Sequence, residues 1–527
     1  MSFLDIQGLS LKAGATEILR DVSLQLERGQ VLGLIGESGA GKSTLALAAI
    51  GFLKPGLTIA GGKVSLDGID LVAASPDELS KLRQSKVAYV AQSAAAAFNP
   101  FYRLGHQVTE LRALRDGIGG SERRQLAAEL FARLQLPEPD RFGLKYPHQV
   151  SGGQLQRAMI AMALLNNPEL IVFDEPTTAL DVTTQVEVLK VIRQVIAAEG
   201  CSAIYVSHDI AVVSQVCDRI VVVRNGVMVE ANETRRIIDS PQTDYARALV
   251  ASRSTSDFNR ETSDTQILIE GRGLDLGYGS VRIVENVDIT VGRSEIVALV
   301  GESGSGKTTV ARAIAGLLVP RRGSVTLSGI RLAASVDDRN DDQRRRIQFI
   351  HQLPDVALNP RQTVRAVLAR PLVKFMGLSG ADLEERLRGL MAEVELPAAL
   401  LDRYPGALSG GQKQRVYIAR CLAAEPDILI CDEVTSALDP LVEESILSLL
   451  WHLNQDKGLG MLFITHNLGV TRRFTDRVVI MERGRIVESG TTKAIFAAPG
   501  EEYTKRLMLA EPSTRAGWLD ERIASGD

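Results

Sequence analysis

The 527-residue sequence has no apolar stretch long enough to cross a membrane. The longest-looking run, at 158–165, is far below the ~18 residues that a membrane-spanning helix needs. The opening segment, MSFLDIQGLS, has neither the positive region nor the apolar region of a signal peptide. These absences predict a chain that is cytosolic or lies at a membrane surface.

An excess of charge and clustered cysteine are also missing. The formal net charge of −4 is small for this length and argues against a broad nucleic-acid-binding surface, so no nucleic-acid partner is expected. The cysteines show no C-x-x-C spacing, and they are Cys201, Cys217, Cys421 and Cys431. Because scattered cysteines are typical of a reducing compartment, we expect buried free thiols.

What the sequence does contain is an internal repeat. Residues 8–24 align without gaps on 273–289, and GESGAGKST at 36–44 meets GESGSGKTT at 301–309 at the same offset of 265. Three further features recur at an offset of 258: the segment SGGQ, the segment FDEPTTALD (CDEVTSALD in the second half) and a histidine, His208 and His466. Since order and spacing are nearly preserved, one unit of about 250 residues is used twice.

The repeat predicts the domain organisation. We expect a first domain at residues 1–250, a linker at 251–266, a second domain at 267–510 and a C-terminal tail at 511–527. The linker is polar, rich in Ser and Thr, and without hydrophobic periodicity. Strands that alternate with helices predict a mostly parallel, doubly wound α/β sheet in each domain. Helical-looking stretches at about 102–141 and 362–403 interrupt this alternation and predict an inserted helical subdomain.

Each half has a glycine-rich loop between a strand and a helix. In the first half, the apolar run at 31–35 is followed by G-x-x-x-x-G-K-[ST] at 36–43. The glycines let backbone N–H groups face phosphates, and the helix N-terminus adds a positive dipole. Lys42 supplies charge to the β- and γ-phosphates, and Ser43 offers its hydroxyl to Mg²⁺. Residues 301–308, with Lys307, repeat the pattern, so a chance glycine-rich turn is a poor alternative.

Two apolar strands, one in each half, end in paired carboxylates. These are Asp174-Glu175 and Asp432-Glu433. Acids at the carboxyl edge of a parallel sheet lie where ligands bind. We expect each Asp to hold the Mg²⁺ shell and each Glu to orient the attacking water as general base. A helix N-cap explains an isolated Asp-Glu equally well, but the order with the glycine-rich loop favours catalysis.

The SGGQ segments at 151–154 and 409–412 each open a helix. The ordinary alternative is a capped helix start, with Ser151 and Ser409 as N-caps. However, two glycines in a first helical turn cost ~1 kcal/mol each. They are explained if a ligand must approach the backbone closely, and an anion is the natural candidate.

Together these motifs resemble the ABC-type ATPases, over nearly the whole chain. The resemblance implies two tandem P-loop NTPase (ABC) cassettes, each a RecA-like core with an antiparallel β subdomain and an inserted helical subdomain. In that family two cassettes pair head to tail, so one chain forms a pseudo-dimer here. Each nucleotide is then shared by both halves: Lys42 and Glu175 with Ser409 and Gly411, and Lys307 and Glu433 with Ser151 and Gly153.

The resemblance also assigns residues between these motifs. Gln92 and Gln352 resemble the glutamines that sense Mg²⁺ and water and link to a membrane partner. The catalytic set is completed by two switch histidines, which contact the γ-phosphate, although a lone histidine after a strand is more often structural. These histidines are His208 and His466. Asp181 and Asp439 match the loop that crosses the interface between cassettes.

ATP and Mg²⁺ are therefore the expected ligands. The expected phosphate-loop contacts are Gly36, Ser38, Gly39, Gly41, Lys42, Ser43 and Thr44, and Gly301, Ser303, Gly304, Gly306, Lys307, Thr308 and Thr309. The SGGQ segments add Ser151, Gly153, Gln154, Ser409, Gly411 and Gln412. The expected metal residues are Ser43, Gln92, Asp174, Thr308, Gln352 and Asp432.

The two halves differ at the expected adenine contact. The family often stacks adenine on an aromatic residue ahead of the glycine-rich loop, and the second half has Tyr278 there. The gapless alignment places Ala13 at this position in the first half. Because stacking is worth on the order of 1 kcal/mol, we expect weaker nucleotide binding in the first site. The catalytic residues are complete in both halves, so two competent sites are expected.

Weaker motifs resemble the dipeptide/oligopeptide/nickel importer ATPases. Asn-Pro follows each Gln, at 99–100 and 359–360, and Tyr-Pro-His precedes the first SGGQ at 146–148. Each half ends in a Pro-then-Tyr segment, at 240–247 and 498–505. Both segments lack the histidine of that group, and no cysteine follows Cys431, so the match is imperfect.

The resemblance implies an ATPase that powers import of a peptide-like or similar small solute. Its expected partners are two transmembrane permease subunits and an extracytoplasmic solute-binding protein, with the chain peripheral on the cytoplasmic face of the inner (cell) membrane. A fused sugar-importer ATPase is the alternative, although its second cassette is often degenerate. A translation-factor-type protein is expected to have a long basic linker, whereas the linker here is short and rich in Ser and Thr. A DNA-repair-type protein is expected to have zinc-binding cysteines or long coiled coils, and the sequence shows neither. The ATPase motifs themselves do not distinguish an exporter.

Overall fold

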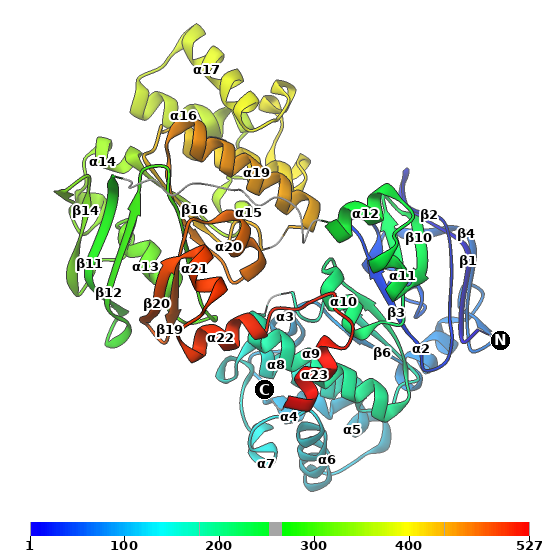
Figure 1. The fold of residues 1–527 in the computed structure, drawn as a ribbon. Helices are drawn as coiled ribbons and strands as arrows, with labels where there is room; N and C mark the ends of the chain where they lie inside the picture. The colour runs from blue at the N-terminus through cyan, green and yellow to red at the C-terminus, as the bar shows by residue number, and fades with distance from the viewer. Residues whose placement is uncertain (1, 179, 252–265, 437, 526–527) are drawn as a thin grey trace. The chain divides into compact units, whose positions relative to one another are not determined.

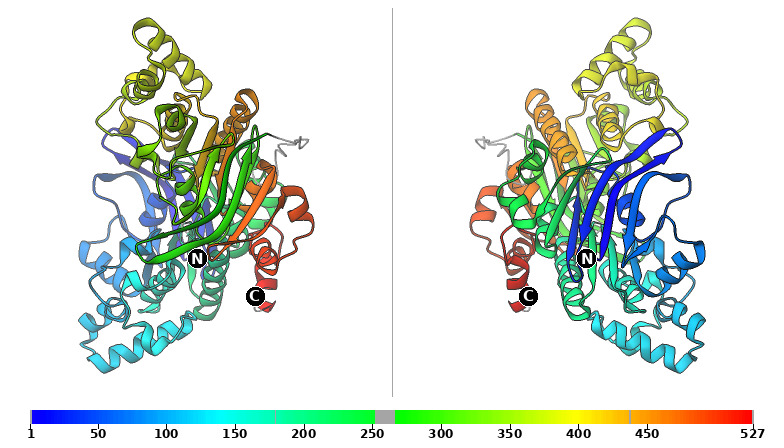
Figure 2. Two further views of the ribbon diagram at one scale, coloured as in Figure 1. Left: turned by 90° about the vertical axis from the view of Figure 1, so that its left-hand side faces the viewer. Right: turned by 90° about the vertical axis from the view of Figure 1, so that its right-hand side faces the viewer.

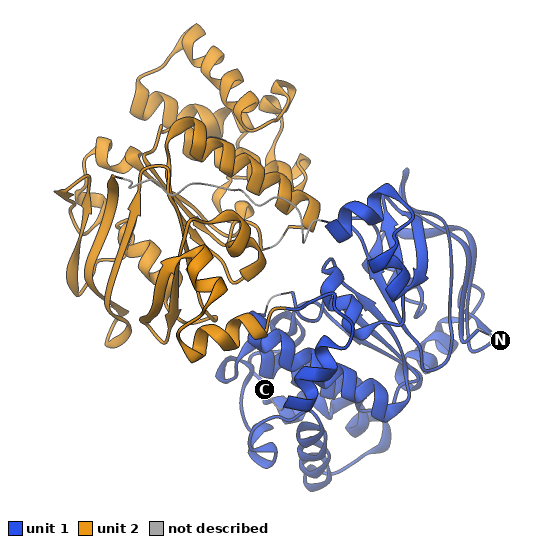
Figure 3. Ribbon diagram, in the orientation of Figure 1, with its two compact units in different colours: residues 1–254, 512–527 blue, residues 255–511 orange. Residues whose placement is uncertain are grey.

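The computed structural model describes residues 2–178, 180–251, 266–436 and 438–525. The chain divides into two compact units, residues 1–254 with 512–527, and residues 255–511 (Figure 3). All but the first and last residues of the expected linker, 251–266, lie outside the described residues. The segment expected to be a tail belongs to the first unit, a placement that the sequence did not indicate.

The first unit is built on two sheets (Figure 1). The smaller, antiparallel sheet has the order β2-β1-β4-β5, with bounds β1 Leu4–Ala13, β2 Thr16–Leu26, β4 Leu57–Leu66 and β5 Ile69–Asp70. The larger sheet has the order β10-β9-β3-β8-β7-β6, with bounds β3 Val31–Ile35, β6 Val87–Val90, β7 Leu170–Asp174, β8 Ser202–Val206, β9 Arg219–Arg224 and β10 Val227–Glu233. Its strands are parallel except for the β9–β10 pair. Every residue of β3, β7 and β8 is buried, as expected for a parallel sheet covered on both faces.

The helices of the first unit fall into two groups, those of the inserted helical segment and those outside it. Outside the inserted segment the helices are α1 Lys42–Ala48, α2 Pro76–Ser85, α3 Ala94–Ala97, α8 Gly152–Leu164, α9 Val182–Glu199, α10 Ile210–Val216, α11 Thr234–Asp239, α12 Asp244–Ala251 and α23 Trp518–Ser525. The inserted helical segment contains α4 Leu104–Val108, α5 Glu110–Asp116, α6 Gly120–Arg133 and α7 Pro139–Phe142. This segment, coloured cyan, forms one end of the unit in Figure 2.

The second unit repeats this architecture. Its antiparallel sheet has the order β12-β11-β14-β15, with bounds β11 Ile267–Tyr278, β12 Val281–Gly292, β14 Arg322–Leu327 and β15 Ile330–Arg331. Its larger sheet has the order β16-β17-β18-β13-β19-β20, with bounds β13 Ile296–Val300, β16 Ile347–Ile350, β17 Ile428–Asp432, β18 Gly460–Ile464, β19 Arg477–Glu482 and β20 Arg485–Thr491. The helices are α13 Lys307–Ile314, α14 Asp341–Arg346, α15 Pro354–Ala357, α16 Val364–Met376, α17 Gly380–Glu393, α18 Gly410–Leu422, α19 Pro440–Lys457, α20 Leu468–Phe474, α21 Thr492–Ala497 and α22 Glu502–Leu509.

Each unit therefore has a mostly parallel core sheet, an antiparallel sheet and an inserted helical segment, which confirms the expected fold class. All four cysteines are buried and free, as expected. No helix in the described part of the chain combines the length and the apolar character needed to cross a bilayer.

Candidate nucleotide sites

The glycine-rich loops connect a central strand to a helix in both units, β3 to α1 and β13 to α13. The first glycine of each loop has a φ that only glycine adopts readily, 149° at Gly36 and 155° at Gly301. A Cβ on Gly36 would lie 1.9 Å from the carbonyl oxygen of Val223, and one on Gly301 would lie 2.2 Å from that of Met481. These positions therefore require glycine on conformational and steric grounds.

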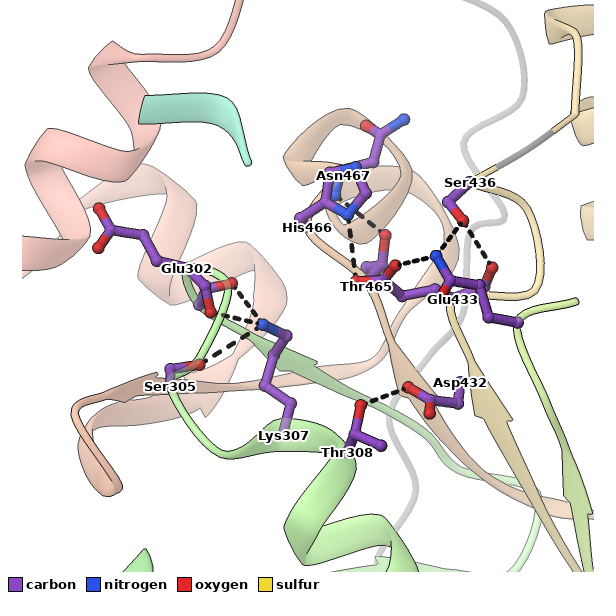
Figure 4. A network of polar contacts seen from close by, with 12 residues as sticks. Glu302, Ser305, Lys307, Thr308, Asp432, Glu433, Ser436, Thr465, His466 and Asn467 are labelled. Carbon is purple, nitrogen blue, oxygen red and sulfur yellow. Dashed lines mark hydrogen bonds and ion pairs between the residues drawn. The ribbon is translucent and has the colours of Figure 1, made fainter. Parts of the chain in front are cut away.

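The loop lysines are buried inside their own loops. The Lys42 ammonium donates hydrogen bonds to the carbonyl oxygens of Gly36 and Glu37, both at 2.8 Å. Lys307 makes the same contacts with Gly301 at 2.7 Å and Glu302 at 2.8 Å (Figure 4). The positively charged ammonium group of a lysine thus lies in the concavity of each loop, where it can attract the phosphates of a nucleotide.

A hydroxyl and a carboxylate meet beside each lysine. The Ser43 hydroxyl donates a 2.7 Å hydrogen bond to Oδ1 of Asp174, and Thr308 donates a 3.0 Å hydrogen bond to Oδ1 of Asp432. Figure 4 shows the second of these pairs at the carboxyl end of β17. Oxygen donors of this kind suit Mg²⁺, which prefers one or two carboxylates together with waters and phosphate oxygens. The side chains present therefore fit the expected metal.

The glutamate after each aspartate lies within a polar cluster. Gln92 donates to Oε2 of Glu175 at 3.1 Å, and Nδ1 of His208 lies 3.5 Å from the same oxygen. In the second unit, Gln352 donates to Glu433 at 2.8 Å. The structure therefore brings the expected Gln, Glu and His residues together within each unit.

The electrostatics of these clusters favour an ionised glutamate. Burial alone would raise the pKa of Glu175, but the hydrogen bond and charge of His208, together with the charge of Lys42, lower it overall. The same balance, with His466 and Lys307, lowers the pKa of Glu433. An ionised carboxylate can accept a proton from water, as a general base must.

The pKa of Asp432, the aspartate of the second site, shifts in the opposite direction from the pKa values of the two glutamates. Burial, opposed by the hydrogen bond from Thr308, raises the pKa of Asp432, and the neighbouring charge of Glu433 adds to this shift. A bound divalent cation would favour the ionised form of such a carboxyl group.

The two glutamates are also held in an uncommon backbone conformation. Glu175 has a φ of 49° and Glu433 a φ of 50°, in the left-handed region. Their N–H groups donate to the carbonyl oxygens of Val206 at 2.9 Å and Ile464 at 3.0 Å, on the neighbouring strand. Backbone strain of this kind clusters at functional sites, where the surrounding structure maintains it.

The SGGQ serines are N-caps, with complete capping boxes to Gln154 and Gln412. The second glycine of each segment has an additional structural reason. A Cβ on Gly153 would lie 2.1 Å from Cγ2 of Thr184, and one on Gly411 would lie 2.7 Å from Cγ1 of Val442. Close packing of α8 on α9, and of α18 on α19, therefore requires glycine there.

The aspartates expected to lie at an interface cap these same partner helices. Asp181 accepts a hydrogen bond from the N–H of Thr184, and Asp439 accepts one from the N–H of Val442, both at 3.1 Å. Each thus fixes the start of the helix that follows its Asp-Glu strand. The residues two positions earlier, at 179 and 437, lie outside the described part of the chain.

The adenine positions are equivalent in the fold. Ala13 ends β1 and pairs with Thr16 across a hairpin, and Tyr278 ends β11 and pairs with Val281 in the same way. The Tyr278 side chain is 45% exposed, and its hydroxyl lies 3.5 Å from Nη1 of Arg312. An exposed aromatic ring is thus present beside the second loop, whereas the equivalent residue of the first unit is alanine.

Sequence reasoning missed two tyrosines that contact the glycine-rich loops. The hydroxyl of Tyr245, on α12, accepts a 3.0 Å hydrogen bond from the N–H of Glu37. Tyr503, on α22, accepts the equivalent bond from Glu302, also at 3.0 Å. Both lie in the Pro-then-Tyr segments noted in the sequence, but nothing in those segments indicated the loop 200 residues earlier as their partner.

A third tyrosine was also missed. The Tyr89 hydroxyl, on β6, donates a 2.8 Å hydrogen bond to Oδ2 of Asp174. Burial and the charge of Asp174 raise the pKa of Tyr89, so the hydroxyl keeps its proton and remains a donor.

Fold and site together define a tandem P-loop ATPase. The ABC transporter family profile matches residues 19–178 and 284–436. The chain is 34% identical to the peptidoglycan transport ATP-binding protein YejF of Agrobacterium fabrum, over 96% of both chains. It is 35% identical to the uncharacterized ABC transporter ATP-binding protein YejF of Escherichia coli, over 93% of this chain and 95% of that one. It is 34% identical to the glutathione import ATP-binding protein GsiA of Salmonella paratyphi A, over 97% of this chain and 89% of that one.

The chain belongs to the ABC transporter family, as two fused cassettes. It is an ATP-hydrolysing subunit of an ABC transporter and uses ATP with Mg²⁺. The likeness to import ATPases extends over nearly the whole chain.

Proposed function

We propose that this protein powers the import of a peptide-like solute through two permease subunits, supplied by an extracytoplasmic solute-binding protein. The observation that carries the proposal is the likeness, over nearly the full length of both chains, to a two-cassette protein named for glutathione import. Glutathione is itself a small peptide. The Asn-Pro and Pro-then-Tyr segments, shared with peptide-type importers, support the same conclusion.

We assign the chemical roles from the contacts within each unit. Lys42 and Lys307 hold the phosphates, and Asp174 and Asp432, with Ser43 and Thr308, hold the metal. Bound Mg²⁺ would neutralise charge on the β- and γ-phosphates. Glu175 or Glu433 takes a proton from the water that attacks the γ-phosphorus, while the bond to the bridging oxygen breaks and ADP leaves.

The histidine and glutamine of each cluster position its glutamate. His208 and His466 lie within 3.5 Å of a glutamate oxygen, and Gln92 and Gln352 donate to that carboxylate. These contacts restrict the orientation of the base, which lowers the entropic cost of reaching the reactive geometry. We further propose that Ser151, Gly153, Ser409 and Gly411 each complete the nucleotide site of the opposite cassette.

Exposed apolar side chains beside the glutamines support docking of the permeases. Phe101 is 84% exposed and Val356 is 81% exposed, and each follows its glutamine by fewer than ten residues. Each has a second exposed apolar residue close to it in the sequence, Tyr102 and Leu353, and grouped exposed apolar side chains mark protein contact sites. The proposed location is therefore the cytoplasmic face of the cell membrane, peripheral to the permeases.

Reconstitution tests the import proposal. The full chain would be combined with its permease subunits and their binding protein, in vesicles with ATP inside. Uptake of labelled di- and tripeptides is expected, and uptake of maltose-type sugars is not. The Glu175→Gln/Glu433→Gln variant controls for ATP-independent entry. Sugar uptake, or ATP-dependent efflux of peptides from the compartment that holds the ATPase, would contradict the proposal.

A further inference from the structure

Both oxygens of the Asp174 carboxylate are held by hydroxyl groups. Ser43 donates to Oδ1 at 2.7 Å, and Tyr89 donates to Oδ2 at 2.8 Å. The donors come from two different elements, since Ser43 lies in α1 and Tyr89 lies in the edge strand β6. Two bonds at opposite oxygens restrict the rotation of the carboxylate about its Cβ–Cγ bond more tightly than one bond does.

The second unit lacks the second donor. Tyr89 pairs with Val172, two residues before Asp174, and Phe349 pairs with Ile430, two residues before Asp432. Each aromatic residue also lies three residues before its glutamine, so the two positions are equivalent in the fold. Phenylalanine carries no hydroxyl. Within the described residues, Thr308 makes the single hydrogen bond to the Asp432 carboxylate.

The occurrence of Phe349 shows that the fold does not need this hydroxyl. Both rings are partly buried and pack against the equivalent core of their own unit. The ring therefore serves packing in both cassettes, and the hydroxyl is an addition found in the first. A hydrogen bond to a charged group is stronger than one between neutral groups, so its effect on the carboxylate is measurable.

We propose that Tyr89 is a positioning residue for the metal carboxylate of the first nucleotide site. By holding Oδ2 of Asp174, it presents the carboxylate to the metal in one orientation and lowers the metal concentration that this site requires. The second site lacks this support and has the exposed Tyr278 ring in place of Ala13. The two sites thus differ in which part of Mg²⁺–ATP they bind more strongly. The first site has the additional support for the metal, and the second has the additional contact for the adenine ring.

The test measures metal binding in the full-length chain. In a Lys307→Ala background, nucleotide is confined to the first loop, and free Mn²⁺ is followed by its EPR signal with AMP-PNP present. The affinity for AMP-PNP in EDTA is measured separately. Tyr89→Phe, which copies the residue of the second unit, is expected to raise the half-saturating Mn²⁺ concentration about tenfold, the lower end of what one hydrogen bond to a charged group contributes. Metal-free AMP-PNP affinity is expected to stay unchanged.

Two matched variants complete the experiment. Phe349→Tyr, in a Lys42→Ala background, is expected to lower the Mn²⁺ requirement of the second site. Tyr205→Phe makes the same chemical change on β8, where the second unit has Phe463, and is expected to leave Mn²⁺ binding unchanged. Thermal unfolding of each variant reports whether the fold is kept.

The inference rests on the proposed metal role of Asp174, and Asp174→Asn separates the two. If Asp174→Asn abolishes Mn²⁺ binding but Tyr89→Phe leaves it unchanged, the positioning role is overturned while the metal role stands. An equal loss of metal-free AMP-PNP binding in Tyr89→Phe would also overturn it, since that is a structural effect. If Asp174→Asn binds Mn²⁺ normally, the metal assignment itself fails.

Discussion

Nδ1 of His466 lies 3.3 Å from Oε1 of Glu433, and His208 makes the equivalent contact with Glu175 at 3.5 Å. Because each histidine orients the proposed base, its removal should slow the chemical step more than it weakens ATP binding. The His208→Ala/His466→Ala variant is expected to lower kcat at least about tenfold with a small change in KM. His452→Ala, on the exposed face of α19, is the control. A rise in KM at unchanged kcat would contradict the positioning role.

The tyrosines that contact the glycine-rich loops give a second prediction. Tyr245→Phe and Tyr503→Phe each leave one loop N–H without its acceptor, which loosens the loop. Affinity for ATP at that site is expected to fall about threefold, measured by titration calorimetry, as for the loss of one modest hydrogen bond. Tyr404→Phe, at an exposed tyrosine, should have no effect. Unchanged affinity in both loop variants would show that the contact is dispensable.

A third prediction concerns pH. Burial raises the pKa of Glu230, but hydrogen bonds from the N–H groups of Gln242 and Thr243 and from the Thr243 hydroxyl lower it overall. Because the folded pKa is depressed, the stabilisation is present above the unfolded value of 4.5 and is lost as pH falls through the folded pKa.

The variant that tests this is Glu230→Gln. Its Tm should be below that of the parent at pH 7, and the difference should shrink below about pH 4.5. Glu488 is the counterpart in the second unit: burial raises its pKa, but hydrogen bonds from the N–H groups of Gly500 and Glu501 help to lower it overall, and Glu488→Gln should behave alike. A difference in Tm that is constant from pH 7 to pH 4 would exclude this linkage.

The C-terminal segment gives a fourth prediction. Nε2 of Gln215 donates to the carbonyl oxygens of Ser513 at 2.5 Å and Arg515 at 2.9 Å, and its Oε1 accepts a bond from the N–H of Leu519 at 3.1 Å. Trp518 and Leu519 are buried in the first unit. Trp518→Ala should therefore destabilise that unit by about 3 kcal/mol.

Hydrogen exchange can locate this effect. Faster exchange is expected in α9 and α10 of the Trp518→Ala variant, with the core strands of the second unit unchanged. Trp518→Phe should restore most of the protection. The second unit has Arg473 where the first has Gln215, and this arginine pairs with Glu444 instead. Equal changes in hydrogen exchange in both units would mean that the C-terminal segment does not act through its contacts with the first unit.

Much of the fold and site could be predicted because the signals are local. The loop from Gly36 to Ser43 and the pair Asp174-Glu175 combine a buried strand with residues whose chemistry is specific. Their recurrence in order gave the two cassettes, and the observed sheets confirm the α/β class. The clustering of Gln92 and His208 on Glu175 follows from the carboxyl ends of parallel strands meeting at one edge.

The contacts that were missed join residues far apart in the sequence. Tyr245 reaches Glu37, and Gln215 reaches Leu519, and neither pair carries a local pattern that names its partner. The direction of the Tyr89 hydroxyl depends on the register of β6 against β7, which the sequence does not show. The sequence accounts for the SGGQ glycines by a ligand alone. The packing of Gly153 on Thr184 depends on how two helices are placed, which the sequence does not show.

We assign Glu175 and Glu433 as the bases of two ATPase sites in one chain. Steady-state ATP hydrolysis by the full-length Glu175→Gln/Glu433→Gln variant tests it most directly, with bound nucleotide measured in the same sample. We predict turnover below about 1% of the parent, with ATP trapped, because the amide cannot accept the proton of the attacking water. Hydrolysis at the parental rate would contradict the assignment.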